Sequence, residues 1–502
     1  MLRSVIVAGL LLLLTAPGLG ASSATVVVWN GQSTGSGPIF DTLGRPRIGP
    51  EGEVVFSAFL SGSGINSSND LTLWISRGSL QMACQEGDPY PLAGSGVTAS
   101  CPVTGALNTG GRVFGSTFLA GPGVNTSNDT MRTKFVGEAS SAVLVAREGD
   151  PAPGTDAVFE QAFGDHRMGG SDNVAFSSGL RGGTTNSGIW TGPASSVSLL
   201  AKAGDPAPGL GGDFQGFSSL VLSDSGGLAF QGWTASGNSG LYRGSAMVGP
   251  SLVAGTGALM PGGGTLDFPS TFTINNRGEI AFRGQLQSGN NGIWAASPGV
   301  RVVAVPGQPA PDYGTFIDGG SPSIGDGGDI CFFAHLSSGP DGLYCEIAGT
   351  LQVIVREDDS LAALAPGETV GDLLWQPVVN SSGQVLFLSQ VDTGSGFDLT
   401  WWLRKTSGDL AIIARLGAEL EVSPGLTKTV SSLDLLTGDY PTNIGGGDAT
   451  AFNDRGEVVF SAGFSDGSEG IFVGRPQSVL PDEIFRDGFE TGNAGGWSAS
   501  SP

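Results

Sequence analysis

Short apolar or alternating runs recur along the chain, and clusters of Gly, Asn, Asp and Pro separate them. Such runs are typical of β-strands joined by tight turns. The run NNRGEIAF at residues 275–282 has a near copy, NDRGEVVF, at 453–460. The pattern predicts an all-β protein built from a repeated strand and turn.

Eight copies of this motif align on their last residue, at intervals of 50 to 73 residues. The copies end at Phe56, Gly115, Phe176, Phe230, Phe282, Phe332, Phe387 and Phe460. Gly-Ile-Trp or a related triplet follows most of them, as at 188–190, and a run such as LVAREGDPAPG at 144–154 closes the unit. Each unit therefore predicts four strands, which we call a, b, c and d in chain order.

Four strands in a unit of about 50 residues correspond to one blade of a β-propeller. The eighth unit has no strand d after GIFVG at 470–474, whereas residues 24–37 align with strand d and the exit loop of other units. A first strand that completes the last blade leaves no open sheet edge. We therefore predict a closed β-propeller of eight four-stranded blades over residues 25–477, with the N-terminal strand as the last blade's outer strand.

The two ends and the charge restrict the cellular location and the partners. A signal peptide is predicted at 1–24, because the chain begins with MLR, continues with an apolar run over 4–14 and then has small residues up to Ala24. Residues 478–502 form a C-terminal tail that is a candidate sorting segment. No second long apolar segment follows, so no membrane span is expected after signal removal. The net charge of −23 disfavours nucleic acid, because phosphate backbones need clustered cations. We expect a monomer.

Four cysteines in an exported chain favour disulfides. Cys331 and Cys345 lie in two predicted strands, equidistant from a turn near Gly339, and should face each other across a hairpin. Cys84 and Cys101 are then the second pair.

The motif carries a family resemblance. Asn-x-x-Gly-x-x-Ala-Phe is intact at Asn275, Gly278, Ala281 and Phe282, and it resembles the bacterial secreted proteins described as choice-of-anchor tandem repeat NxxGxxAF-containing proteins. The resemblance covers the repeat region. It implies export and a C-terminal sorting or anchoring device, and it implies no known activity. We expect a secreted or cell-surface protein, with the periplasm as the alternative.

Antiparallel strands place the b–c loops and the d–a connections on one face of the ring. Asp88, Asp150 and Asp205 follow strand d in three units and would lie on that face. Ca²⁺ prefers six to eight oxygen ligands, so these residues are the candidate metal site. The alternative is that each Asp caps its own turn.

The longest interval between motifs contains an insertion at 424–451, and such loops often carry function. Its candidate ligand residues are Asp434, Asp439, Tyr440 and Asp448. Alternatively, the insertion covers the mouth of the ring.

One large aromatic residue recurs in strand c and could stack on sugars. Packing between blades is the favoured interpretation, because large apolar area is best hidden there. The series is Trp74, Trp190, Tyr242, Trp294, Tyr344 and Phe472.

No catalytic residue and no cofactor can be assigned from these patterns. His166 and His335 lie in different units, and no G-x-S-x-G nucleophile elbow, which joins a strand to a helix, is expected in an all-β chain. We expect a binding propeller for an extracellular glycan, protein or surface polymer, with Ca²⁺ as the candidate ion. The alternative is a secreted glycan-acting hydrolase or lyase that uses acidic residues on the loop face.

Overall fold

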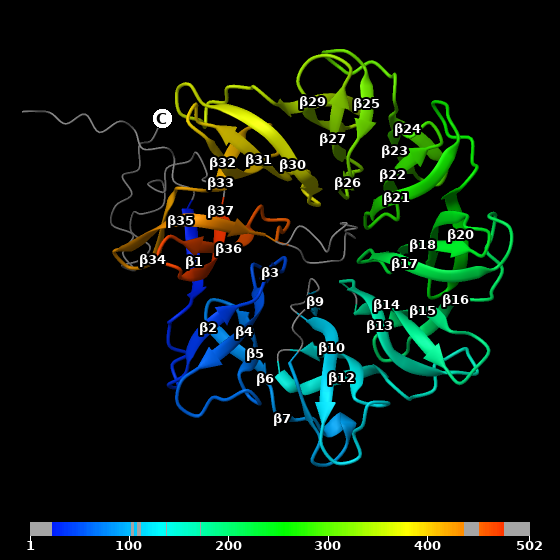
Figure 1. Ribbon diagram of the computed structural model, residues 1–502, viewed down its shortest axis with the longest axis vertical. Coiled ribbons are helices and arrows are strands. Elements are labelled where there is room, and N and C mark those ends of the chain that lie inside the picture. Colours follow the sequence, from blue (N-terminus) through cyan, green and yellow to red (C-terminus); the bar gives the residue numbers. More distant parts are fainter. Residues whose placement is uncertain are drawn as a thin grey trace, which may run out of the picture.

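The computed structural model describes residues 23–101, 105–107, 112–136, 138–170, 172–435 and 451–475. Their strands form eight antiparallel sheets, arranged as blades around a central axis (Figure 1). The predicted all-β propeller with eight blades is therefore confirmed. Residues 1–22 of the predicted signal peptide at 1–24 lie outside the described residues, and its last two residues begin the first strand. The tail at 478–502 also lies outside the described residues.

Blades 1 and 2 have interrupted inner strands. Blade 1 contains β2 (Ile39–Leu43), β3 (Arg47–Ile48), β4 (Val54–Ser61), β5 (Leu71–Ser76) and β6 (Leu80–Gln85). Blade 2 contains β7 (Asp88–Pro89), β8 (Thr98–Ala99), β9 (Gly105–Leu107), β10 (Val113–Ala120), β11 (Thr130–Val136) and β12 (Glu138–Arg147). A short 3-10 helix, η1 (Pro91–Ala93), lies between β7 and β8.

Blades 3, 4 and 5 have the regular order a, b, c, d. Blade 3 contains β13 (Val158–Met168), β14 (Asn173–Arg181), β15 (Ser187–Pro193) and β16 (Ser198–Lys202). Blade 4 contains β17 (Phe214–Leu222), β18 (Leu228–Thr234), β19 (Ser239–Ser245) and β20 (Val248–Gly255). Blade 5 contains β21 (Leu266–Ile274), β22 (Ile280–Leu286), β23 (Asn291–Ala296) and β24 (Val300–Ala304).

Blades 6 to 8 complete the ring. Blade 6 contains β25 (Phe316–Gly319), β26 (Ser323–Ile324), β27 (Ile330–Leu336), β28 (Gly342–Ile347) and β29 (Thr350–Arg356). Blade 7 contains β30 (Thr369–Val379), β31 (Val385–Asp392), β32 (Phe397–Arg404) and β33 (Leu410–Arg415). Blade 8 contains β34 (Glu419–Ser423), β35 (Leu426–Asp434), β36 (Val458–Phe464), β37 (Glu469–Arg475) and the N-terminal strand β1 (Ser23–Trp29).

The predicted closure of the ring is also confirmed. β1 pairs antiparallel with β37, in a register that sets Val26 opposite Phe472. Figure 1 shows the blue first strand beside the orange strands of blade 8. The sequence did not predict β34, which extends blade 8 by pairing with β35.

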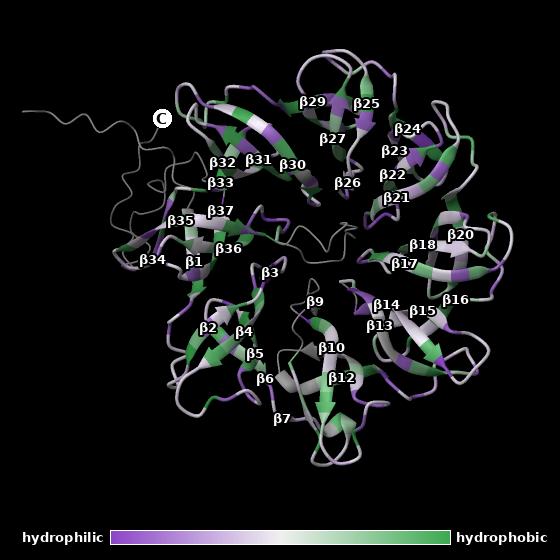
Figure 2. Cartoon of the chain, in the orientation of Figure 1, coloured by the Kyte–Doolittle hydropathy of each residue, from purple (hydrophilic) through white to green (hydrophobic). Residues whose placement is uncertain are grey.

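The hydrophobic core of blade 5 combines Phe282 of strand b and Trp294 of strand c with Phe272 of strand a. Figure 2 shows apolar residues, in green, along the strands of the blades. The strand c aromatic series is buried, with at most 6% of any side chain exposed, so its predicted packing role is confirmed. Each series member stacks or packs on aromatic neighbours, as Trp294 does on Phe282 at 5.9 Å between ring centroids. Trp190 also donates its indole N–H to the carbonyl of Pro153, in the GDPAPG connection that precedes the blade, at 3.0 Å.

Both predicted disulfides are present. Cys331 and Cys345 face each other across the β27–β28 hairpin and are bonded. Cys84 of blade 1 is bonded to Cys101 in the first part of blade 2. Within the described ranges no helix has the length and apolar character needed to cross a bilayer.

Antiparallel pairing gives the ring two different faces. We call the face formed by the b–c loops and the d–a connections the loop face. The opposite face, formed by the a–b turns with the Asn-x-x-Gly motif and by the c–d turns, is the turn face.

Candidate functional site

The Asn of the repeat motif holds its own turn together. Asn275 accepts hydrogen bonds through Oδ1 from the backbone N–H groups of Arg277 (3.0 Å) and Glu279 (2.9 Å). Its Nδ2 donates to the Glu279 carboxylate at 2.7 Å. Asn275 is fully buried, so these bonds satisfy a polar group that would otherwise destabilise the fold.

The same Asn also joins neighbouring blades. Asn275 Nδ2 donates to the Gly325 carbonyl in the next a–b turn at 3.1 Å. Asn380 makes the equivalent bond to the Asn453 carbonyl at 2.9 Å, and Asn453 makes it to the Gly49 carbonyl at 3.0 Å. The last of these bonds crosses from blade 8 to blade 1. The motif is therefore a structural link around the ring on the turn face.

The next residue of the turns in blades 4, 5 and 6 adds a second set of links. The backbone N–H of Asp224 donates to Asn276 Oδ1 at 2.8 Å, and the backbone N–H of Asn276 donates to Asp326 Oδ1 at 2.8 Å. Burial raises the pKa of Asp224, and the nearby carboxylates of Asp326 and Asp454 raise it further, against hydrogen bonds from Gly170 and Asn276 that lower it. The amide of Asn276 separates two of these carboxylates by donating to both.

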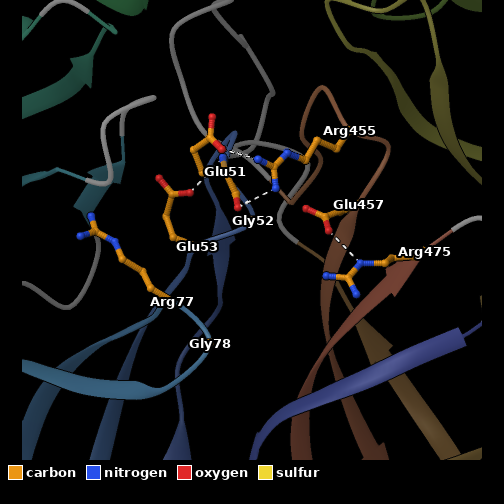
Figure 3. Close-up of a pocket in the computed structure, with 8 residues that line it drawn as sticks. All are labelled: Glu51, Gly52, Glu53, Arg77, Gly78, Arg455, Glu457 and Arg475. Atoms are coloured by element: carbon orange, nitrogen blue, oxygen red, sulfur yellow. Dashed lines mark hydrogen bonds and ion pairs between the residues drawn. The ribbon is translucent and has the colours of Figure 1, made fainter. Parts of the chain in front are cut away.

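A pocket of about 590 Å³ lies on the turn face where blade 8 meets blade 1. Figure 3 shows three glutamates and three arginines around it, from turns far apart in the sequence. Arg455 forms an ion pair with Glu51, and Arg475 Nε contacts Glu457 Oε1 at 2.7 Å. We call this the seam pocket. Two of its carboxylates are thus paired with arginines instead of facing each other across an open cleft, as a glycan-cleaving pair would.

Glu53 replaces the motif Asn at this seam. Blade 1 has Gly49 where the turns of blades 5, 7 and 8 have Asn, and a Cβ on Gly49 would lie 2.4 Å from the Glu53 carboxyl carbon. Glu53 Oε2 accepts the N–H of Glu51 at 3.0 Å, the bond that Asn Oδ1 accepts elsewhere. Glu53 is only 4% exposed, and burial raises its pKa. The carboxylate is therefore a structural part of the ring closure.

The loop face has a different character. The exposed large apolar side chains of the described residues lie on this face, apart from Met82 on an outer strand and Met247 and Val248 in a turn-face hairpin. The most exposed of the loop-face side chains are Leu259, Phe397, Phe118, Tyr313 and Leu92. Exposed apolar patches on monomers often mark interaction sites.

A second pocket, of about 280 Å³, lies between blades 3 and 4 in the loop-face half of their strands. Residues at the end of β14 and the start of β15 form one wall, and the start of β17 with Trp233 of β18 forms the other. We call it the Trp233 pocket. The described side chains that line it carry no charge, in contrast to those of the seam pocket.

The three candidate metal ligands occupy equivalent turns in separate blades. Asp88 Oδ2 accepts the N–H of Gln85 at 2.9 Å, and Asp205 Oδ2 accepts that of Lys202 at 3.1 Å. Asp150 lies in the corresponding turn, and burial raises its pKa. The described residues contain no group of three or more His, Cys, Asp or Glu side chains arranged for a metal ion.

The same turn in blade 5 shows what this position does. Gln308 takes the place of Asp and still accepts the N–H three residues earlier, from Val305, at 3.3 Å. A neutral side chain thus serves the same purpose, and this supports the alternative that each acid caps its own turn.

Of the four candidate ligand residues in the insertion, the structure describes Asp434. Its carboxylate forms an ion pair with Arg45 Nε of blade 1 at 2.8 Å. Asp439, Tyr440 and Asp448 lie outside the described residues.

Sequence reasoning missed both pockets. The seam pocket joins turns whose residues are about 400 positions apart, as Arg455 and Glu51 are. Trp233 lies three residues after the motif Phe and is 38% exposed, and Phe59 and Phe118 hold the same position in blades 1 and 2. A large aromatic residue at this position of a predicted strand b was the one clue available in the sequence.

Comparisons with known proteins place the chain in a family. Residues 18–239 and 225–481 both match the family described as Family of unknown function (DUF7453). No curated protein matches the chain.

Solved structures with a similar arrangement include a puromycin-hydrolysing peptidase of Mycobacterium tuberculosis. It is 12% identical with a TM-score of 0.40 over 84% of this chain, which spans 57% of the length of that protein. The β-propeller domain of the Trilobed protease from Pyrococcus furiosus is 11% identical, with a TM-score of 0.38 over 89% of this chain and 98% of the domain. The eight antiparallel sheets of this chain themselves define the propeller fold.

Proposed function

We propose that the chain, which belongs to the DUF7453 family, is an exported propeller that binds an extracellular glycan, protein or surface polymer through its loop face. The main support is the concentration of exposed apolar side chains on that face. The turn face, by comparison, has its polar groups engaged in links between blades. Large exposed apolar area costs solubility, and binding is the usual reason to retain it.

Export is the second part of this proposal. The predicted signal peptide and the resemblance to secreted NxxGxxAF-repeat proteins support it. Two disulfides support it as well, because such bonds persist mainly in oxidising compartments. Secretion and display at the cell surface both agree with these features.

Selective damage to one face tests the binding function. The loop-face variant carries Phe118→Ser, Leu259→Ser and Phe397→Ser, and the matched turn-face variant carries Met247→Ser and Val248→Ser. All five side chains are more than half exposed, so each change should alter the free energy of unfolding by less than about 0.5 kcal/mol. Thermal melts of both variants check this.

Wild type and both variants are then assayed on a glycan array, on purified peptidoglycan and on whole bacterial cells. We expect wild type and the turn-face variant to be retained on at least one of these surfaces, and the loop-face variant to be lost from it. Retention of a folded loop-face variant at the wild-type level would contradict the proposal. So would a wild-type protein that is retained on none of them.

A further inference from the structure

The Trp233 pocket combines one aromatic wall with uncharged hydrogen-bonding groups. The indole ring lies against strand a of its own blade, because a Cβ added to Gly216 would come within 2.4 Å of Trp233 Cζ2. Only glycine at this position lets the ring lie so close to the backbone. The remaining surface of the ring borders the pocket.

Neighbouring aromatic residues make this wall rigid. Phe217 also lines the pocket, and its ring centroid lies 5.0 Å from that of Phe214 and 5.9 Å from that of Phe230 in the blade core. Phe214 and Phe230 are fully buried. A wall fixed in this way loses little side-chain entropy when a ligand binds.

The opposite wall offers hydroxyl and amide groups. Ser178 and Asn186 of blade 3 line it, although Ser178 is only 3% exposed and its hydroxyl donates to the Gly179 carbonyl at 2.8 Å. Gln215 borders the pocket from the Trp233 wall. Hydroxyl and amide side chains both donate and accept hydrogen bonds. The indole N–H of Trp233 and the side-chain amide of Gln215 form no hydrogen bond with the other residues that the structure describes, so both are available to a ligand.

These features together define a ligand class. A sugar ring presents an apolar C–H face that can cover an indole, and its hydroxyls both donate and accept. The volume of about 280 Å³ lies just below the range of drug-sized sites, which suits a single ring better than a longer segment. The described residues that line the pocket include no Lys, Arg or His, and the chain has a net charge of −23, so an anionic sugar would be repelled.

We propose that the Trp233 pocket is a subsite for one uncharged sugar residue of an extracellular glycan. Trp233 stacks on the ring, and Asn186 and Gln215 bind its hydroxyls. This inference rests on the proposed function and names the ligand class for one site on the loop face.

The test uses the whole mature chain on an array that carries neutral glycans, sialylated and uronic-acid glycans, and apolar peptides. Trp233→Ala removes the stacking wall. Gly216→Ala keeps the indole but displaces it with the added Cβ. Met247→Ala is the control, because Met247 is an exposed apolar residue of the same blade on the turn face, with 94% of it exposed.

We expect wild type and Met247→Ala to bind neutral glycans equally, within about twofold. Trp233→Ala should weaken that binding about tenfold or more, because a stacked aromatic side chain is the typical dominant contact of such a site. Gly216→Ala should weaken it in the same direction. Thermal melts confirm that both variants are folded.

Neutral-glycan binding that survives in both Trp233→Ala and Gly216→Ala would overturn the subsite. Binding confined to acidic glycans or to peptides would also overturn it. If wild type binds no neutral glycan but the loop-face triple variant still loses retention on peptidoglycan or cells, the sugar inference fails and the proposed function stands. If wild type is retained on no surface, both fail.

Discussion

The turn face and the loop face are made by the same repeat, yet their side chains have different tasks. On the turn face, the Asn of one a–b turn donates to the backbone of the next turn, as Asn275 does to Gly325. On the loop face, large apolar side chains such as Leu259 and Phe397 remain exposed. The repeated motif therefore describes how the blades are held together. In the proposed function, residues outside the motif determine what the ring binds.

Opening the ring should have the largest effect on stability, because both faces depend on closure. Val28 lies in the closing strand β1 and is fully buried. Val28→Asp places an unpaired carboxylate in that core and should lower the free energy of unfolding by about 3 to 5 kcal/mol. Urea denaturation measures the loss.

The control for this change is Thr25→Asp, in the same strand at an exposed position. It should alter the free energy of unfolding by less than about 0.5 kcal/mol. Equal effects of the two substitutions would show that β1 is not part of a cooperative ring.

A second experiment compares two similar asparagine turns, one on each face. Asn275→Ala removes the bonds within the a–b turn and leaves the Gly325 carbonyl without its donor, so we expect a loss of about 2 to 3 kcal/mol. Asn66 in a b–c loop accepts the N–H of Ser68 at 3.0 Å but is exposed. Asn66→Ala should therefore cost less than about 1 kcal/mol.

Chemical denaturation of both variants measures the difference. If Asn275→Ala costs no more than Asn66→Ala, the bond to the next blade contributes nothing to stability. The description of the turn face as the structural face would then be wrong.

The smallest expected effect concerns pH and the seam pocket. Burial raises the pKa of Glu53 above its ordinary value of 4.5. The unfolded chain therefore releases this proton at a lower pH than the folded ring does. Glu53 therefore lowers the free energy of unfolding at high pH. This loss is absent below pH 4.5 and grows as the pH rises from there through the raised pKa of the folded state. Glu53→Gln removes the titration and can keep an acceptor oxygen for the Glu51 N–H.

Melting curves of wild type and Glu53→Gln between pH 4 and pH 8 measure this effect. Wild type should gain stability relative to Glu53→Gln as the pH falls through this window. A relative loss of wild-type stability on acidification would mean that the folded ring favours the charged carboxylate.

Much of the fold could be predicted because it repeats. The motif at Asn275 to Phe282 recurs at a spacing that only a few architectures share, and the misplaced strand d revealed the closure. The disulfide of Cys331 and Cys345 followed from their symmetry about a turn. Interrupted inner strands such as β2 and β3 were not predicted, because Gly44 and Pro46 between the two short runs are equally typical of the turns that separate whole strands.

The sites were harder to predict because they depend on contacts between blades. The sixth residue of strand b is Phe59 in β4, Phe118 in β10 and Trp233 in β18. A pocket lined by Trp233 also needs Gly216 beneath the ring and neutral side chains on the adjacent blade. A single sequence contains these residues but does not indicate that they meet.

Hydrogen exchange of the bound protein shows which face of the ring contacts the ligand. Wild type is labelled alone and on the surface that retains it, and amide exchange is followed by mass spectrometry. If the loop face binds the ligand, exchange should slow at the loop-face segments 115–121, 214–218 and 257–268. Exchange at the turn-face segments 245–249 and 275–279 should not change. Protection of the turn-face segments without protection of the loop-face segments would contradict binding through the loop face.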